Sequence, residues 1–186
     1  MIDNLPKQLE AWHDFYMVVG TGAAALTGLL FVIVSLGPRV VAPQANKGVR
    51  GFVSPIATHF TTVLVASSIM LVPGLPLPVL GGFFVGGGCG GIVYTAWTRV
   101  HKLWRANNLS ALDWIWYAAM PVLCFALIAA SGALIMAGLA IGLYVIAGAT
   151  LLLVVVGIRN AWDIVLWVAK RQPELEKKAR RFERLR

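Results

Sequence analysis

The sequence predicts an all-α fold, a polytopic bundle of transmembrane helices, and two observations support that prediction. First, 59% of the 186 residues are hydrophobic and only 13% are charged, which leaves too few charged side chains to cover a soluble domain of this size. Second, the apolar residues are concentrated in runs of about 20, the length that crosses a bilayer as a helix. Because lipid offers no hydrogen bonds to the backbone, each run is expected to be helical.

Five such runs are expected to span the membrane. The expected spans are residues 15–36, 52–72, 79–98, 112–137 and 139–169. The Pro-rich segment 73–78 cannot continue a helix and separates the second span from the third, and Gly138 marks a tight turn before the fifth. The chain therefore divides into a transmembrane domain, residues 1–169, and a basic cytoplasmic tail, residues 170–186.

The distribution of basic residues predicts the orientation of the spans. Three basic residues follow the first span and three follow the third, whereas the connections after the second and fourth spans carry no charge. Connections rich in Lys and Arg stay in the cytoplasm. The N-terminus is therefore expected outside and the C-terminus inside, as an odd number of spans requires.

The tail contains a pattern of its own. Pro173 suits the first turn of a separate helix, and acidic residues precede basic ones in the order that the helix dipole favours. Two interpretations stay open: a basic amphipathic helix lying on anionic lipid, or a solvated segment that ends the last span.

The third expected span carries a repeated pattern of small residues. Gly82, Gly86 and Gly90 recur at every fourth position, a spacing that lets another helix backbone approach closely. The first span holds a similar stripe of Gly20, Ala24 and Gly28. We expect these small faces to make helix-packing contacts, within one subunit or between subunits; a hinge or a broken helix lining a pore is the alternative.

Two polar residues lie at the outer end of the first span. His13 and Asp14 follow Trp12 directly. A histidine and a carboxylate at a membrane surface relay protons or hold a cation. The alternative is that Asp14 caps the helix and that its neighbours anchor the span at the interface.

A second candidate site lies near the inner side. His59 falls about seven residues into its span, roughly 10 Å past the boundary, where an ionisable group marks a functional site by default. Arg159 and Asp163 lie one helical turn apart in the fifth span, and an arginine in the membrane needs a partner. We predict that these three residues form one polar cluster lining the cytoplasmic half of the bundle; the alternative is three separate anchors.

Three segments carry a resemblance. They are residues 11–32, His59-Phe60-Thr61 and Arg159-Asn160-Ala161-Trp162-Asp163. These segments resemble a family of small, uncharacterised bacterial inner-membrane proteins, some of which are labelled modulators of a membrane protease. The resemblance implies a multi-pass protein of the bacterial inner membrane and supplies no catalytic residues.

Several function classes are excluded by what the sequence lacks. Signatures of hydrolases, metalloproteases and P-loop kinases are absent, so the chain is expected not to be an enzyme. Its two cysteines, Cys89 and Cys124, lie in apolar runs, and we expect no metal site and no cofactor. The net charge of +8 comes from the membrane-flanking basic residues, and without a recognition motif it does not indicate nucleic-acid binding.

Two functions remain. The first is a homo-oligomeric channel or carrier for an ion or small solute, favoured by polar residues on apolar helices and by glycines that could build a symmetric assembly. The second is an accessory or regulatory subunit of a larger membrane complex, favoured by the lack of an internal repeat and of any catalytic motif. The expected partners are the lipid bilayer and either further copies of the chain or other membrane subunits.

Overall fold

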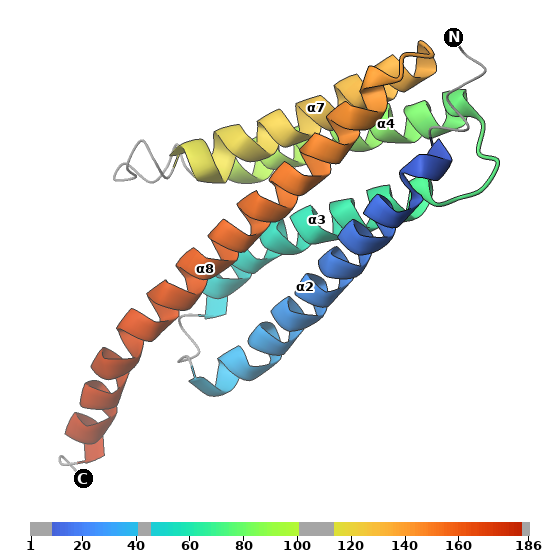
Figure 1. Cartoon of the computed structure of the whole chain (residues 1–186). Coiled ribbons are helices and arrows are strands. Elements are labelled where there is room, and N and C mark those ends of the chain that lie inside the picture. The colour runs from blue at the N-terminus through green and yellow to red at the C-terminus, as the bar shows by residue number, and fades with distance from the viewer. Residues whose placement is uncertain (1–8, 41–45, 101–113, 184–186) are drawn as a thin grey trace.

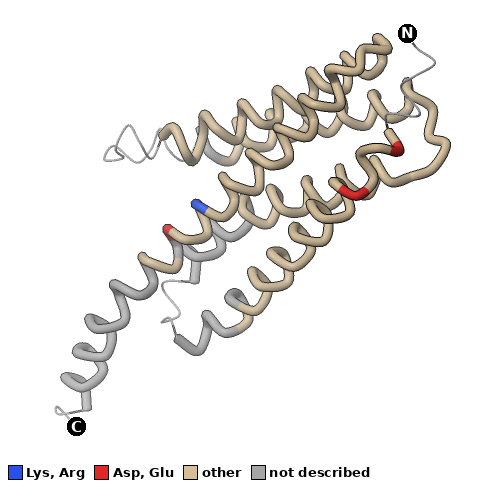
Figure 2. The backbone as a smooth tube through the Cα atoms, in the orientation of Figure 1, with Lys and Arg blue, Asp and Glu red and all other residues tan. Residues whose placement is uncertain are grey.

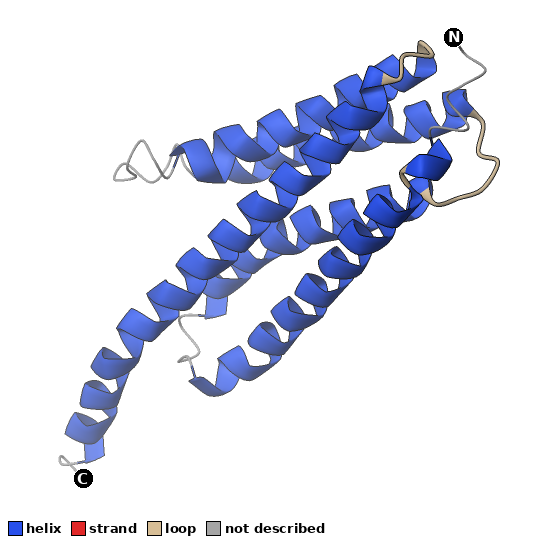
Figure 3. Ribbon diagram, in the orientation of Figure 1, coloured by secondary structure: helices blue, strands red, loops and turns tan. Residues whose placement is uncertain are grey.

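A computed structural model describes residues 9–40, 46–100 and 114–183, and all of its regular elements are helices (Figures 1 and 3). The elements are α2 (His13–Val40), α3 (Asn46–Met70), α4 (Leu77–Thr95), η2 (Ala96–Val100), η3 (Ile115–Ala119), α7 (Met120–Met136) and α8 (Ile141–Glu183). Of these, η2 and η3 are π-helical turns that extend α4 and α7 at the same end. The described part of the chain is therefore all-helical.

Four of the helical segments are long and apolar enough to cross a membrane. They are His13–Val32, Leu77–Thr98, Ile115–Met136 and Ile141–Asp163. These segments indicate an integral, multi-pass membrane protein. The second expected span differs, because the apolar part of α3 among the described residues, Pro55–Met70, is shorter than the other four. The count of five spans and the orientation stay predictions.

The helices form two antiparallel hairpins that α8 joins. Helix α2 packs along α3, α4 packs along α7, and α8 crosses between the pairs in contact with both α3 and α7 (Figure 1). The core lies at that crossing, and its side chains that are at most 1% exposed include Val63, Phe125, Ile146, Leu153 and Val156. Helix α8 is therefore the element that holds the two hairpins together.

The bundle has two distinct ends. The N-terminal end carries the start of α2, the connection 71–76 and the turn 137–140 (Figure 1). There, the Trp12 ring lies 5.0 Å from the Tyr144 ring, which ties the start of α2 to α8. The C-terminal end carries the end of α2, the start of α3, η2, η3 and the later part of α8.

Glycines bring α4 and α7 into close contact, but in a different register from the one expected. A Cβ atom on Gly88 would lie 2.5 Å from the backbone nitrogen of Ala129, and one on Gly132 would lie 2.7 Å from the nitrogen of Val85. Gly81 faces Gly132 in the same contact. With 3.6 residues per turn, positions 81, 88 and 91 share the face of α4 that also buries Leu80 and Phe84.

The predicted stripe of Gly82, Gly86 and Gly90 faces away from this contact. A Cβ atom on any of the three would meet nothing within 4 Å. These glycines therefore make no helix-packing contact within the described part of the subunit. The face of α4 that packs against α7 is instead the one that buries Leu80 and Phe84. Packing through them between subunits stays a prediction.

The turn before α8 forms as expected. Gly138 has a φ of 74°, a left-handed conformation that glycine adopts without steric cost. The amide of Gly138 donates to the carbonyl of Ile135 at 2.9 Å, and the amide of Leu139 donates to that of Leu134 at 2.9 Å. These are the two hydrogen bonds of a Schellman motif, which ends α7 and reverses the chain.

Helix α8 is longer than any span requires. Its 43 residues extend about 65 Å at 1.5 Å per residue, roughly twice the thickness of the hydrocarbon core. The helix continues through Pro173 to Glu183, so the expectation of a separate tail helix starting at Pro173 is wrong. A proline removes only one hydrogen bond of the ladder, and α8 continues past it.

Candidate functional site

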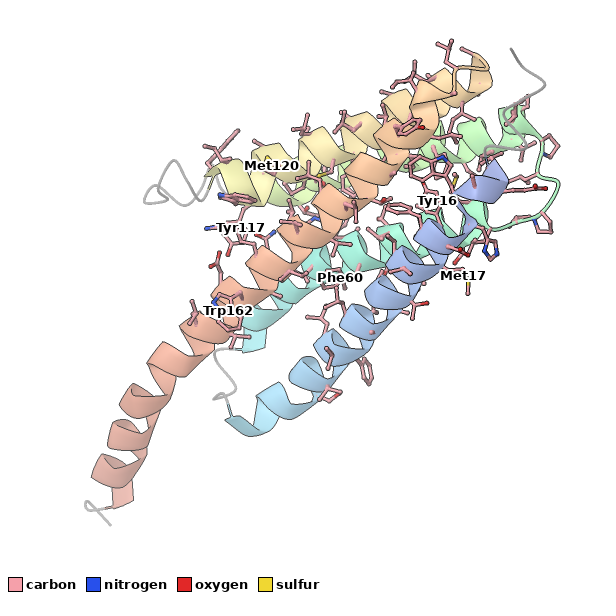
Figure 4. All side chains as sticks on the ribbon, viewed as in Figure 1. Tyr16, Met17, Phe60, Tyr117, Met120 and Trp162 are labelled. Carbon is pink, nitrogen blue, oxygen red and sulfur yellow. The ribbon has the colours of Figure 1, made fainter. Side chains whose placement is uncertain are left out.

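Arg159 and Asp163 of α8 meet two aromatic residues of η3. The guanidinium of Arg159 lies 4.0 Å from the Asp163 carboxylate and 4.6 Å from the centre of the Trp116 ring. The hydroxyl of Tyr117 donates to the same carboxylate at 3.1 Å. Both charged side chains are about one third exposed. These four residues, which we call the Arg159 cluster, connect α8 to η3, the turn that precedes α7 (Figures 2 and 4).

The Arg159 cluster lies near one end of the apolar part of α8. Arg159 is 18 residues after Ile141, the start of α8, or about 27 Å along the helix. The hydrocarbon core is about 30 Å thick. This distance favours a position at the membrane edge over one at mid-membrane, and the aromatic neighbours suit that depth.

His59 lies deeper in the bundle. Its side chain is 2% exposed, and its ring centre is 6.4 Å from that of Phe125 on α7. The next residue, Phe60, packs against α8 at Gly157, where a Cβ atom would lie 2.6 Å from the phenyl ring. Arg159 and Asp163 therefore come together as predicted from their spacing, whereas a direct contact of His59 with them stays a prediction.

Three further buried side chains have polar atoms without hydrogen-bond partners in the described part of the chain. They are the hydroxyl of Tyr16, the hydroxyl of Ser67 and both polar atoms of the Asn160 carboxamide. Tyr16 and Ser67 are 1% exposed and Asn160 is 0% exposed. A buried polar atom without a partner costs about 1–3 kcal/mol, so such atoms are uncommon in native proteins and require an explanation.

Other buried hydroxyls in the same bundle are satisfied by their own helix. Thr150 donates to the carbonyl of Ala147 at 2.9 Å, and Ser131 donates to that of Ile128 at 2.7 Å. Even Ser68, next to Ser67, donates to the carbonyl of Leu64 at 2.8 Å. The absence of such a bond at Ser67 is therefore a specific feature of that residue.

The unpartnered atoms lie along the interfaces of α2, α3 and α8. Gly20 on α2 faces Ser67, with a Cβ atom there 3.0 Å from the Ser67 Cβ, and Tyr16 is one turn nearer the N-terminal end (Figure 4). On α8, Asn160 lies three residues beyond Gly157, the contact point of Phe60.

We call Tyr16, Ser67, His59 and Asn160 the buried polar line. Because α3 and α8 are antiparallel and meet at Phe60 and Gly157, Ser67 lies about 10 Å to one side of this contact and Asn160 about 5 Å to the other. The line therefore extends over about half the thickness of a bilayer core.

The spacing of residues in the second expected span contains a signal for this line. His59, Val63, Ser67 and Met70 are spaced by four, four and three residues, and all four are buried, which is the pattern of one helix face. The threonines of the same helix belong to another face. If the polar residues of 52–72 are grouped by helical face, Ser67 falls on the same face as His59.

The threonine face of α3 borders a groove toward α4. The groove has a volume of 470 Å³ and its lining consists of Ala57, Thr58, Thr61, Thr62, Val65, Ala66, Ile69, Phe83, Phe84, Gly87 and Ile128. The Thr62 hydroxyl is bonded to the carbonyl of Thr58 at 2.8 Å. The lining is mostly apolar, and the groove lies on a different face of α3 from the buried polar line.

His13 and Asp14 lie at the opposite end from the Arg159 cluster. Nδ1 of His13 is 3.4 Å from the Asp14 carboxylate, and both side chains are exposed. Helix α2 begins at His13, so Asp14 lies within the first turn, where the helix dipole favours an acid, and not at the capping position. A proton-relay or cation-binding role of this pair stays a prediction.

The described residues contain no group of three or more His, Cys, Asp or Glu side chains that could hold a metal ion. Comparisons of the chain with protein-family models, with curated proteins and with solved structures found no match. The resemblance of the three segments to a bacterial inner-membrane family therefore stays an expectation, and the geometry of the bundle carries the argument about function.

Proposed function

We propose that the protein is a channel or carrier for a small solute or ion, and that the buried polar line is part of its path. The observation that supports this most is the set of unpartnered polar atoms on Tyr16, Ser67 and Asn160. Within a membrane, polar groups on the interior of a helix bundle commonly mark the route of a substrate. A passing molecule would supply the hydrogen bonds that the chain itself does not.

The burial of these atoms separates this proposal from a purely structural role. A partner subunit contacts only exposed side chains, and the three residues are at most 1% exposed. A second protein chain therefore cannot reach them while the helices stay packed. Buried polar sites in proteins are instead occupied by small molecules, water above all, where there is room for them.

We further propose a five-span topology with the N-terminus outside and the C-terminus in the cytoplasm of a bacterial cell, in the inner membrane. The 25 residues of α3 give a helix of about 37 Å, which is long enough to cross the hydrocarbon core beside α2, along which it packs. The basic residues Arg39, at the end of α2, and Lys47 and Arg50, at the start of α3, support the same orientation.

A homo-oligomer is supported by the exposed glycines of α4. Gly82, Gly86, Gly87 and Gly90 have no neighbouring atoms within 4 Å of a Cβ position. Glycines at every fourth position allow close approach of a helix from another subunit. The same face favours the second candidate function, an accessory subunit of a larger complex, if that helix belongs to a different protein.

Flux measurements on the purified protein in liposomes test the proposal. A channel or carrier increases the rate at which solutes cross the vesicle membrane relative to protein-free vesicles. An accessory subunit leaves that rate unchanged and co-purifies with another membrane protein in stoichiometric amount. The second result would refute the transport function.

A further inference from the structure

The side chains of the buried polar line carry almost no charge. Tyr16 and Ser67 offer hydroxyl groups and Asn160 offers a carboxamide, all neutral at neutral pH. His59 carries a charge only when it is protonated. The line therefore consists of hydrogen-bonding dipoles and not of fixed charges.

Four charged side chains have a described burial, Glu10, Asp14, Arg159 and Asp163, and none of them is buried. Glu10 and Asp14 are exposed at the N-terminal end. Arg159 and Asp163 are about one third exposed and pair with each other, so their charges largely cancel (Figure 2). Among these four side chains, none would place an unpaired opposite charge beside an ion that entered the line.

The backbone offers no substitute for such a charge. Membrane proteins that pass ions without buried charged side chains use exposed carbonyl oxygens, in filters or at breaks in helices. Helices α2, α3 and α8 continue through the level of the line, and Pro55 of α3, which donates no backbone hydrogen bond, lies one turn before His59. In the described residues, positive φ angles occur only at Gly74 and Gly138, in the connections between helices. The carbonyls along the line are therefore used within the helices.

These observations together point to a particular class of substrate. We infer that the transported species is a small uncharged molecule that both donates and accepts hydrogen bonds, and that it is not an ion. An ion loses its hydration shell at a large free-energy cost that only opposite charges or several oriented carbonyls offset. A neutral solute loses a few hydrogen bonds to water and regains them from hydroxyl and carboxamide groups.

Asn160 is the residue that defines this substrate class most closely. Its carboxamide presents two donor hydrogens and an acceptor oxygen, and both polar atoms lack partners among the described residues. Such a group can bind a donor and an acceptor of one solute at the same time. Ser67 and Tyr16, toward the N-terminal end, each offer one hydroxyl that can both donate and accept.

The test compares neutral and ionic permeability in one preparation. This inference rests on the proposed transport function, so the full-length protein is first reconstituted in liposomes. Uptake of urea and of glycerol is followed by light scattering after an osmotic jump, and K⁺ and Cl⁻ conductance is recorded on the same material. We expect at least one neutral solute to enter roughly tenfold faster than in protein-free vesicles, with ion conductance at the protein-free level.

Two variants assign the permeability to the line. Asn160→Leu replaces the carboxamide by an apolar group with the same number and branching of heavy atoms and is expected to return neutral flux to near the protein-free rate. Thr61→Val changes a hydroxyl on the groove face of α3 and is expected to leave the flux unchanged. Equal losses in the two variants would contradict the assignment to Asn160.

The possible results distinguish this inference from the function on which it rests. Ion conductance above that of protein-free vesicles, without flux of neutral solutes, would overturn the inference and leave the transport function supported. Vesicles that pass neither neutral solutes nor ions would overturn both.

Discussion

From the contact between α4 and α7 we predict opposite effects on stability when two glycines of α4 are replaced by alanine. Gly88 and Gly86 lie on opposite sides of α4. A Cβ atom on Gly88 would lie 2.5 Å from the Ala129 nitrogen and 2.6 Å from the Phe125 carbonyl oxygen, whereas one on Gly86 would meet nothing within 4 Å. Gly88→Ala therefore forces two backbones apart, and Gly86→Ala adds a methyl group to an open surface.

The expected sizes of the two effects follow from known substitutions. Overpacking of a close contact costs about 1–3 kcal/mol, and replacing glycine by alanine within a helix stabilises it by up to about 1 kcal/mol. In separated subunits, where the oligomer contact proposed for this face is absent, Gly86→Ala should be neutral or slightly stabilising. Because the new methyl group would meet backbone atoms, the upper end of the overpacking range applies. Gly88→Ala should therefore be destabilising by about 2 kcal/mol after the gain in helix propensity is subtracted.

The assay is reversible unfolding of the purified protein in mixed micelles by a denaturing detergent, followed by far-UV circular dichroism. The Gly86→Ala protein serves as the matched control for helix propensity. We expect a lower midpoint for Gly88→Ala only. Equal midpoints for the two variants, or a lower midpoint for Gly86→Ala alone, would refute the register of the α4–α7 contact.

Three further predictions concern other parts of the bundle. Gly138→Ala should lower stability by about 1–2 kcal/mol, because the φ of 74° at this position is strained for an L-residue, whereas Gly138→Asn should recover part of that loss because asparagine tolerates this conformation. Unfolding midpoints in the same assay measure both effects, and an unchanged midpoint for Gly138→Ala would contradict the prediction. Tyr117→Phe removes the 3.1 Å hydrogen bond to Asp163 and should cost about 0.5–1.5 kcal/mol; a variant as stable as wild type would mean that this bond does not hold η3 against α8. Cys89 lies on the surface of a span, where it faces lipid or detergent, and Cys124 is buried between helices. A small apolar maleimide, added at alkaline pH to the folded protein in micelles, should therefore modify Cys89 faster than Cys124, as read by mass spectrometry; equal rates for the two would exclude the observed rotation of α4 and α7.

Much of the fold could be predicted from the sequence because lipid restricts the choices. Long apolar runs must be helical in a membrane, and a glycine between two such runs marks a turn, as Gly138 does. The rotation of each helix was harder to predict. Span 79–98 contains glycines on several faces, and the pattern of Gly82, Gly86 and Gly90 looked most regular, but the buried Leu80 and Phe84 decide which face turns inward.

The candidate site could be predicted only in part for the same reason. Arg159 and Asp163 interact because their spacing of four residues places them on one face whatever the tertiary packing. The pairing of Tyr117 and Trp116 with them depends on how η3 lies against α8, which local spacing does not determine. Asn160 and Ser67 are recognisable as unusual only once their burial and the lack of partners are known.

The central claim, that the buried polar line is used by a passing molecule, is tested most directly by measuring stability and flux together in Asn160→Leu. Replacing a buried, unpartnered carboxamide by an apolar group with the same heavy-atom branching should leave the protein as stable as wild type, or more stable by about 1–3 kcal/mol. The same change should reduce flux into liposomes by roughly tenfold or more. A variant that is stable and transports at the wild-type rate would contradict the account, since Asn160 would then have no part in the path.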